Sequence, residues 1–241
     1  MRRLAAPLLA VLVLAGCSGE QGERAQALLT RAQTAQARLS SMGYEVRMTF
    51  SIDGQKAALV LDGGGYLKGR RAGDQLVTMR VEGVPGMAAT NVRMVLRGRR
   101  MSFGLNGRQT SLTVPVQSKA QYDLSGSVTE LARYVKDVRV HENRVVNGER
   151  GATVTGVIDT EGLLKAAAKL QALTQASGTA APDMSKLAEH VGDTRAALFI
   201  ARRTGLIRSA VIGVSLEAGG KTVDLDLTYR LKHVNRAIPG L

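Results

Sequence analysis

Cys17 is the only cysteine of this 241-residue chain, and its surroundings are chemically the most distinctive in the sequence. Two arginines, Arg2 and Arg3, open the chain, and an uncharged run from Leu4 to Ala15 follows them. A basic start, a short apolar run and small residues before a cleavage point are typical of a secretory signal peptide. The run is too short for a transmembrane helix, which needs roughly 20 apolar residues. The sequence therefore predicts export, with a thiol at the cleavage point.

The stretch Leu14-Ala15-Gly16-Cys17 resembles the bacterial lipobox. In a lipobox the cysteine thiol receives a diacylglyceryl group and becomes the mature N-terminus. We therefore expect residues 1–16 to be a lipoprotein signal peptide, Cys17 to be the lipidation site and residues 17–23 to be a polar tether. Two or three acyl chains, palmitate among them, would hold the protein on a membrane, since each buried methylene contributes about 0.8 kcal/mol. The alternative is an ordinary signal peptide with an incidental cysteine.

The chain is strongly basic, with a formal net charge of +13. Such a charge in a cytosolic protein would indicate nucleic acid as the partner. Export argues against that partner, and the basic residues are scattered along the sequence instead of clustered in one arm or helix. Attraction to an anionic membrane or glycolipid is one explanation of the charge. General solubility is the other, and the sequence does not decide between them.

The pattern of apolar residues predicts one helix followed by many strands. Apolar residues recur at helical spacing from Arg24 to Met42, and Gly43 is expected to end the helix. Strict alternation follows in Tyr44–Ile52, which is typical of a strand with one apolar face. Asp53-Gly54 and Asn147-Gly148 are typical hairpin turns, and Gly63-Gly64-Gly65 is interpreted as a turn between strands. Further strands are expected at 55–62, 66–71, 75–82, 91–97, 100–105, 109–116, 138–146, 150–158, 195–201, 206–217 and 221–234.

Three more helices are expected, at 128–138, about 161–174 and near 184–191. Short turns between strands imply antiparallel pairing, because parallel pairs need long crossovers. The predicted fold is therefore of the α+β class: a single large curved antiparallel sheet, or half-barrel, of about ten or eleven strands. Amphipathic helices are expected to pack on its concave face, where an apolar cavity can form.

This order of elements resembles the LppX/LprAFG family of actinobacterial cell-envelope lipoproteins and, more distantly, the carriers LolA and LolB. Ala152–Leu164 is similar to the family's strand that runs into an Asp-started helix, and Ala196–Ser215 is similar to its late hairpin. The absence of Trp near Phe199 is a departure from the family. The resemblance implies a single lipid-binding domain over residues 24–241, with acylated lipid or glycolipid held between sheet and helices.

Residues that could carry out catalysis are not grouped in the sequence. His141, His190 and His233 are far apart and are interpreted as surface residues, so no metal site and no cofactor are predicted. Asp224 and Asp226 share one face of a strand, where we expect them to be solvated partners of arginine or lysine. No nucleophile elbow or phosphate loop is present. We therefore expect that the protein is not an enzyme.

Two functions remain from the sequence. The first is a membrane-anchored, outward-facing envelope lipoprotein that binds an acylated lipid or glycolipid for transport or presentation, with an envelope transporter as a possible further partner. The second is a non-enzymatic sensor or assembly factor that uses the same fold to bind a protein. For the first, the candidate cavity residues are the apolar side chains of the alternating strands: Val46, Met48, Phe50, Leu59, Leu61, Met79, Val81, Met94, Leu225, Leu227 and Tyr229.

Overall fold

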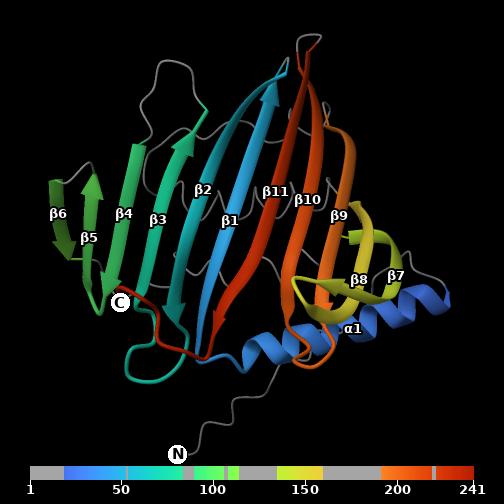
Figure 1. Cartoon of the computed structure of the whole chain (residues 1–241), viewed down its shortest axis with the longest axis horizontal. Coiled ribbons are helices and arrows are strands. Elements are labelled where there is room, and N and C mark those ends of the chain that lie inside the picture. The colour runs from blue at the N-terminus through green and yellow to red at the C-terminus, as the bar shows by residue number, and fades with distance from the viewer. Residues whose placement is uncertain are drawn as a thin grey trace, which may run out of the picture.

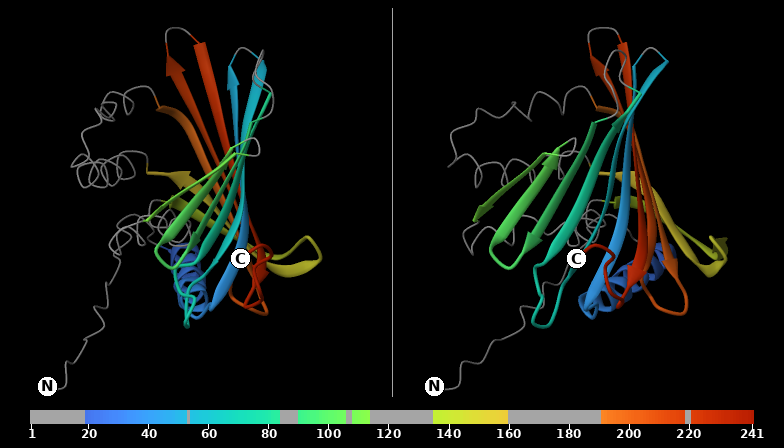
Figure 2. Two further views of the ribbon diagram at one scale, coloured as in Figure 1. Left: turned by 90° about the vertical axis from the view of Figure 1, so that its left-hand side faces the viewer. Right: turned by 60° about the vertical axis from the view of Figure 1, so that its left-hand side comes forward.

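A computed structural model of the chain describes residues 19–52, 54–83, 90–105, 108–113, 135–159, 191–218 and 221–241. Within these ranges lie one helix and eleven strands, and all of the strands belong to one antiparallel sheet. The sheet is open and curved, and the helix lies against its concave side (Figures 1 and 2). This confirms the half-barrel that the alternating patterns predict.

Helix α1 (Glu20–Ala37) starts earlier and ends earlier than the sequence suggests. Glu20 and Glu23 lie in its first turn, where negative charge stabilises a helix N-terminus. The helix stops at Ala37 because the next residues are held by the sheet: the Ser40 backbone N–H donates to Asn235 Oδ1 (2.8 Å), and the strand ladder begins at Ser41. Gly43, expected to end the helix, lies inside a strand.

The sheet consists of two meanders that meet in its middle. Its strand order is β6-β5-β4-β3-β2-β1-β11-β10-β9-β8-β7, so the first and last strands are neighbours. Figure 1 shows them side by side at the centre, with β6 and β7 at the two outer ends. The bounds are β1 (Ser41–Ile52), β2 (Gln55–Tyr66), β3 (Gln75–Glu82), β4 (Thr90–Arg97), β5 (Arg100–Leu105), β6 (Arg108–Thr113), β7 (Val135–Val146), β8 (Glu149–Ile158), β9 (Val191–Ala201), β10 (Ile207–Ala218) and β11 (Lys221–Val234).

The Asn-Gly turn adopts the backbone that its residues predict. Asn147 and Gly148 both have positive φ, 50° and 78°, and they join β7 to β8 as a two-residue hairpin. Positive φ at both central residues suits the right-handed twist of the flanking strands. Gly54 also has positive φ at the β1–β2 connection, where a hairpin was expected.

The interpretation of Gly63-Gly64-Gly65 as a turn is wrong. All three glycines lie inside β2, where they pair with Tyr44, Gly43 and Met42 of β1. A Cβ at Gly63 would lie 2.8 Å from the Leu76 carbonyl oxygen and 3.0 Å from the Tyr44 ring. The glycines therefore make room for close neighbours in the sheet. The strand expected at 66–71 is also absent, because β2 ends at Tyr66 and a turn-rich connection follows up to Asp74.

The later helices fall mostly outside the described residues. Of the helix expected at 128–138, residues 135–138 are described, and they form the start of β7, which is a correction. Val135 and Val138 are buried there as strand residues. The helix near 184–191 is corrected at its last residue, because Val191 begins β9. The helix at about 161–174 lies wholly outside the described ranges.

The main core lies between α1 and the concave face of the sheet. Ala25, Leu29 and Ala32 of the helix are buried against a cluster that includes Leu198 and Tyr229. Tyr229 is only 2% exposed, and its hydroxyl is buried without a hydrogen-bond partner in the described part of the chain. Burial, together with the nearby Tyr44, raises the pKa of Tyr229 above its ordinary value. A smaller core formed by Leu96 and Met101 lies toward the β6 end of the sheet.

The glycine run allows a direct test of strand packing. We expect Gly63→Ala to lower the free energy of unfolding by about 1–3 kcal/mol, because the new methyl group would collide with a backbone oxygen and an aromatic ring. Gly104→Ala is the matched control, since the nearest atom to a Cβ at that strand position is 3.8 Å away. Urea unfolding followed by circular dichroism measures both. Equal stability of the two variants would contradict the packing described here.

Tyr229 makes stability depend on pH in the alkaline range. The pKa of Tyr229 is higher in the folded state than in the unfolded state, so the folded protein favours the neutral phenol. The stability that Tyr229 contributes is therefore fully present below about pH 10 and is lost as the pH rises toward the folded-state pKa. Above about pH 10 we expect the free energy of unfolding of the parent protein to fall by roughly 1.4 kcal/mol per pH unit because of Tyr229. We expect this fall to be absent from Tyr229→Phe. Unfolding free energies of parent and variant, compared near pH 8 and pH 11, test this. Parallel losses in the two proteins would be the contrary result.

Candidate functional site

The predicted cavity residues of the central strands lie on one face of the sheet. Residues directly opposite each other in an antiparallel pair point to the same side. Val46 of β1 is opposite both Leu61 of β2 and Tyr229 of β11. Two residues further along β1, Met48 is opposite Leu59 and Leu227. The three central strands therefore present their candidate residues to a common side.

The same register extends across β3 and β4. Leu59 pairs with Val81, Leu61 pairs with Met79, and Met94 pairs with Val77, which is two residues from Met79. We call this side the inner face, because it is the side on which α1 packs. The candidate residues that share the inner face are Val46, Met48, Phe50, Leu59, Leu61, Met79, Val81, Met94, Leu225, Leu227 and Tyr229.

Some of the candidates are part of packed cores. Tyr229 is a member of the core beneath α1, and Val46 and Leu227 pack against that core while partly buried. Met94 packs against Leu96 and Met101 in the smaller core. These four residues therefore pack within the protein.

The remaining candidates lie between the two cores and belong to neither. None of these side chains is buried, and Phe50 is 37% exposed. Leucine, valine, methionine and phenylalanine side chains in this state form an incompletely covered apolar surface, which is informative when the residues are contiguous. We call this surface the apolar strip: Met48, Phe50, Leu59, Leu61, Met79, Val81 and Leu225.

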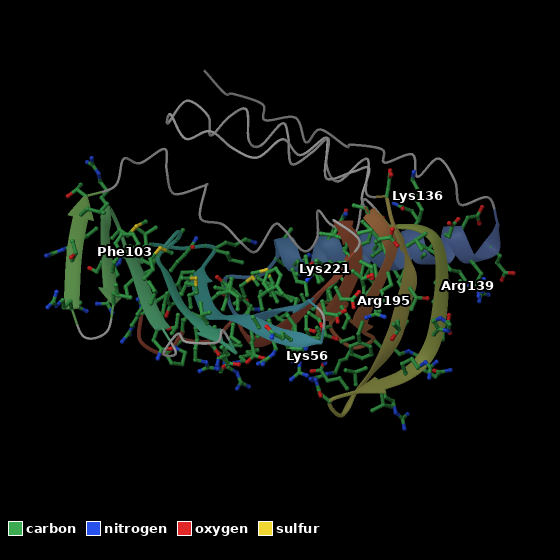
Figure 3. All side chains as sticks on the ribbon, turned by 90° about the horizontal axis from the view of Figure 1, so that it is seen from above. Lys56, Phe103, Lys136, Arg139, Arg195 and Lys221 are labelled. Carbon is green, nitrogen blue, oxygen red and sulfur yellow. The ribbon has the colours of Figure 1, made fainter. Side chains whose placement is uncertain are left out.

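Sequence reasoning missed neighbours of the strip on the same face. Val214 is opposite Leu225, Ile212 is opposite Leu227, and Phe103 is opposite Met94. Viewed from above, Phe103 and Lys56 lie on opposite sides of the sheet (Figure 3). Alternation in 206–217 and 100–105 could have identified these residues, but it does not say which strands lie beside one another.

Ion pairs lie on the outer face of the central strands, which also holds the buried apolar side chains of Ala58 and Val60. Lys232 of β11 contacts the carboxylates of Glu45 on β1 (2.8 Å) and Asp62 on β2. Partial burial lowers the pKa of Lys232, but hydrogen bonds and charge from Asp62 and Glu45 outweigh it and raise that pKa overall. Near one end of β3, Glu82 accepts hydrogen bonds from Arg80 (2.7 Å) and Arg47 (3.0 Å), and these arginines lower the pKa of Glu82 despite some desolvation.

A polar groove of about 320 Å³ lies mainly on the outer face, across β2, β1, β11, β10 and β9. Asp224 and Asp226 line it. Asp226 forms an ion pair with Arg195 (2.8 Å), and Asp224 accepts a hydrogen bond from the Ser215 hydroxyl (2.6 Å). The arginine partner expected for this pair is confirmed at Asp226. Both carboxylates are engaged in contacts typical of a solvated strand face.

A second hollow, of about 400 Å³, lies between α1 and the β8–β9 region. Leu28 and Ile200 contribute apolar surface to it, and Arg24, Arg31 and Arg202 contribute charge. Arg31 spans from the helix to the loop after β9, where its Nη2 donates to the Arg202 carbonyl oxygen (3.0 Å). The hollow is therefore braced by a contact between helix and sheet.

The histidines that the structure describes lie far apart on β7 and β11. His141 lies within hydrogen-bonding distance of the Thr155 hydroxyl (3.1 Å), and His233 is exposed with its ring beside Gly43. Across the residues that the structure describes, no three His, Cys, Asp or Glu side chains are grouped as metal ligands. Cys17 and His190 lie outside the described residues, so lipidation at Cys17 stays a prediction. No helix in the described ranges is both long enough and apolar enough to span a membrane.

Sequence comparison finds no match for this chain among protein-family models or curated proteins. Structural comparison does find similar proteins. The crystal structure of LprF from Mycobacterium bovis matches with a TM-score of 0.54 and 14% identity, covering 91% of this chain and 97% of that one. The Mycobacterium tuberculosis lipoprotein LppX has 14% identity, covers 90% of this chain and 97% of its own, and has a TM-score of 0.48.

A more distant match is the MucA/MucB complex of Pseudomonas aeruginosa. Its TM-score is 0.35 at 14% identity, and the match covers 90% of this chain and 59% of that one. TM-scores below 0.5 support no inference, so the fold assignment rests on LprF. The match to LprF extends over nearly the full length of both chains, as the resemblance in the sequence predicts. The chain therefore has the fold of LprF, the curved-sheet fold of the LppX/LprAFG lipoproteins.

Proposed function

We propose that this protein is a membrane-anchored envelope lipoprotein that binds an acylated lipid or glycolipid against the apolar strip, for lipid transport or presentation. The observation that carries the proposal is the strip itself. Its residues come from four neighbouring strands, β3, β2, β1 and β11, and share one face in continuous register. None is buried, although the same face is packed in the cores on either side.

The physical argument concerns apolar surface that the protein leaves partly uncovered. An acyl chain lying on the strip would remove its own methylenes from water, at about 0.8 kcal/mol each. Ten such methylenes would give a gross gain of about 8 kcal/mol, before the costs of ordering the chain. The two methionines of the strip suit ligands of varied shape, because their side chains are flexible and polarisable.

The proposed function is binding without catalysis. The strip consists of methionine, leucine, valine and phenylalanine side chains, and none of these is a nucleophile or a general acid or base. The resemblance to LppX/LprAFG proteins, which bind acylated lipids or glycolipids between sheet and helices, is consistent with this role. A bound lipid would be taken up and released unchanged.

Anchoring is the second part of the proposal. Acyl chains on Cys17 would hold the mature protein on the outward-facing side of the cell membrane, with residues 17–23 as the link to the domain. The support is the signal-like N-terminus and the Leu-Ala-Gly-Cys stretch. A lipid-binding domain tethered in this way would remain beside a source of its ligand.

Metabolic labelling tests the anchor. Cells expressing the full chain and fed an alkyne analogue of palmitate are expected to yield a labelled protein in the membrane fraction. Cys17→Ser is expected to abolish the label, because the chain contains no other thiol. Persistence of the label in this variant, or its absence in the parent protein, would argue against lipidation at Cys17.

Lipid extraction tests the ligand. The unacylated mature chain, residues 17–241 with Cys17→Ser, is exported behind a cleavable signal peptide that carries no lipobox, purified from its native envelope and analysed by native mass spectrometry. We expect a co-purifying diacyl or triacyl species at a ratio near one to one. A clean mass without lipid under gentle conditions would count against lipid binding and would favour the protein-binding alternative.

A strip variant localises the binding. Leu59→Asn with Met79→Gln is expected to lower lipid occupancy about tenfold, because two apolar contacts of the acyl chain become polar. Thr49→Gln with Thr78→Gln is the matched control, since these residues alternate with strip residues along β1 and β3 and face the other side. Equal occupancy in the two variants would place the lipid somewhere other than the strip.

A further inference from the structure

One edge of the sheet gathers connections that are far apart in the sequence. Because β1 to β6 and β7 to β11 are antiparallel meanders, every second connection returns to the same edge, which is the lower edge in Figure 1. The C-terminal residues after β11 end there as well. The described segments of this edge are 38–40, 67–74, 97–100, 147–150, 202–206 and 235–241.

Every one of these segments contains at least one arginine. Arg71 is half-buried under its contacts with Tyr66 and Asp74, and the other cations of the edge are exposed. We call this surface the basic edge: Arg38, Lys68, Arg70, Arg71, Arg97, Arg99, Arg100, Arg150, Arg202, Arg203 and Arg236.

Side-chain carboxylates on the same segments are few and already engaged. Asp74 is buried and accepts hydrogen bonds from the Gly98 backbone N–H (2.8 Å) and from Arg71 (3.4 Å). Glu149 forms an ion pair with Arg208 of β10 (2.9 Å). These two are the acidic residues of the six segments, so the edge carries a large excess of positive charge.

The basic edge also lies beside the point where the anchor would attach. Helix α1 runs along this edge in all three ribbon views (Figures 1 and 2). It begins at Glu20, three residues after Cys17. Even a fully extended chain covers only about 3.5 Å per residue, so an acylated Cys17 would hold the start of α1 within about 10 Å of its anchor.

We propose that the basic edge docks on the anionic surface of the membrane to which the protein is anchored. This inference rests on the proposed function for the anchor, and it adds how the domain is oriented. Neighbouring strands are about 4.8 Å apart, so the eleven strands spread these cations over roughly 50 Å measured along the curve of the sheet, and a surface this extended fits a lipid bilayer. Each well-placed cation near such a surface strengthens binding about fivefold.

Docking in this way sets the position of the apolar strip. The strip lies on the inner face of β1, β2, β3 and β11, and these strands all have one end at the basic edge. The sheet would therefore stand on the membrane by one edge, with the strands rising from it. On β1 and β11 the inner-face residues nearest that edge belong to the core beneath α1, so docking would hold the strip above the membrane surface, toward the far half of the strands.

Vesicle co-sedimentation tests the docking surface with the unacylated mature chain, residues 17–241 with Cys17→Ser. This chain retains all of the described elements, since α1 begins at Glu20. Vesicles contain phosphatidylcholine alone or with about 30% phosphatidylglycerol, as the anionic probe. We expect binding to the anionic vesicles only, and we expect it to be lost as salt rises from about 0.05 M to about 0.5 M.

Charge variants locate the surface. Lys68→Gln, Arg70→Gln and Arg99→Gln together are expected to weaken anionic-vesicle binding at least tenfold. The control removes the same number of charges near the opposite end of the strands, through Lys56→Gln, Arg108→Gln and Lys221→Gln, and is expected to lose less than threefold. Equal losses would show that net charge alone drives binding and would overturn the proposal, as would failure of the parent chain to bind anionic vesicles.

Two controls separate loss of docking from unfolding and from loss of lipid binding. If circular dichroism shows that the triple edge variant is unfolded, Arg99→Glu alone, in the exposed β4–β5 turn, replaces it and is expected to weaken binding at least fivefold. Lipid occupancy of the edge variant, measured by extraction from detergent micelles, is expected to equal that of the parent chain. Loss of occupancy with vesicle docking retained would identify a failure of the strip and not of the edge.

Discussion

The pairing of β1 with β11 is the interaction on which the rest of the structure depends. These strands come from opposite ends of the chain, and each is the innermost strand of its own meander. Their register aligns the apolar residues of both halves on one face. Hydrogen bonds at the end of the pair reinforce it. The backbone N–H and the hydroxyl of Ser40 both donate to Asn235 Oδ1, and the Ser41 hydroxyl donates to the Arg236 carbonyl oxygen (2.6 Å). Lys232 adds an ionic contact that spans β11, β1 and β2.

The inner face of this sheet is divided into three parts by what covers it. Beneath α1 the face is packed and includes Tyr229, whose buried hydroxyl is costly for the core to hold. Toward β6 a smaller cluster centres on Leu96 and Met101. The apolar strip lies between them, and its residues are as hydrophobic as those of the packed parts. The difference between core and candidate site therefore lies in coverage and not in residue type.

That division explains how much could be predicted from sequence. Alternation in Val46, Met48 and Phe50 identifies a strand and its apolar face, because the side-chain period of a strand is two. It does not reveal that β1 lies beside β11, since partner choice depends on long-range packing. It also cannot distinguish Val46, which packs on the core, from Met48, which does not. The prediction of a turn at Gly63 was wrong because contacts between strands decide the structure there: the glycine leaves room for the Tyr44 ring.

The central position of β1 has a consequence for how this chain folds. Synthesis proceeds from the N-terminus, so β1 to β6 are made before β11. Until β11 arrives, one side of β1 is an unpaired edge with a full row of backbone hydrogen-bonding groups, which favours association with other chains. Completion of the sheet must therefore wait for the last strand. Protection of that edge until β11 is available becomes a requirement for the yield of native protein.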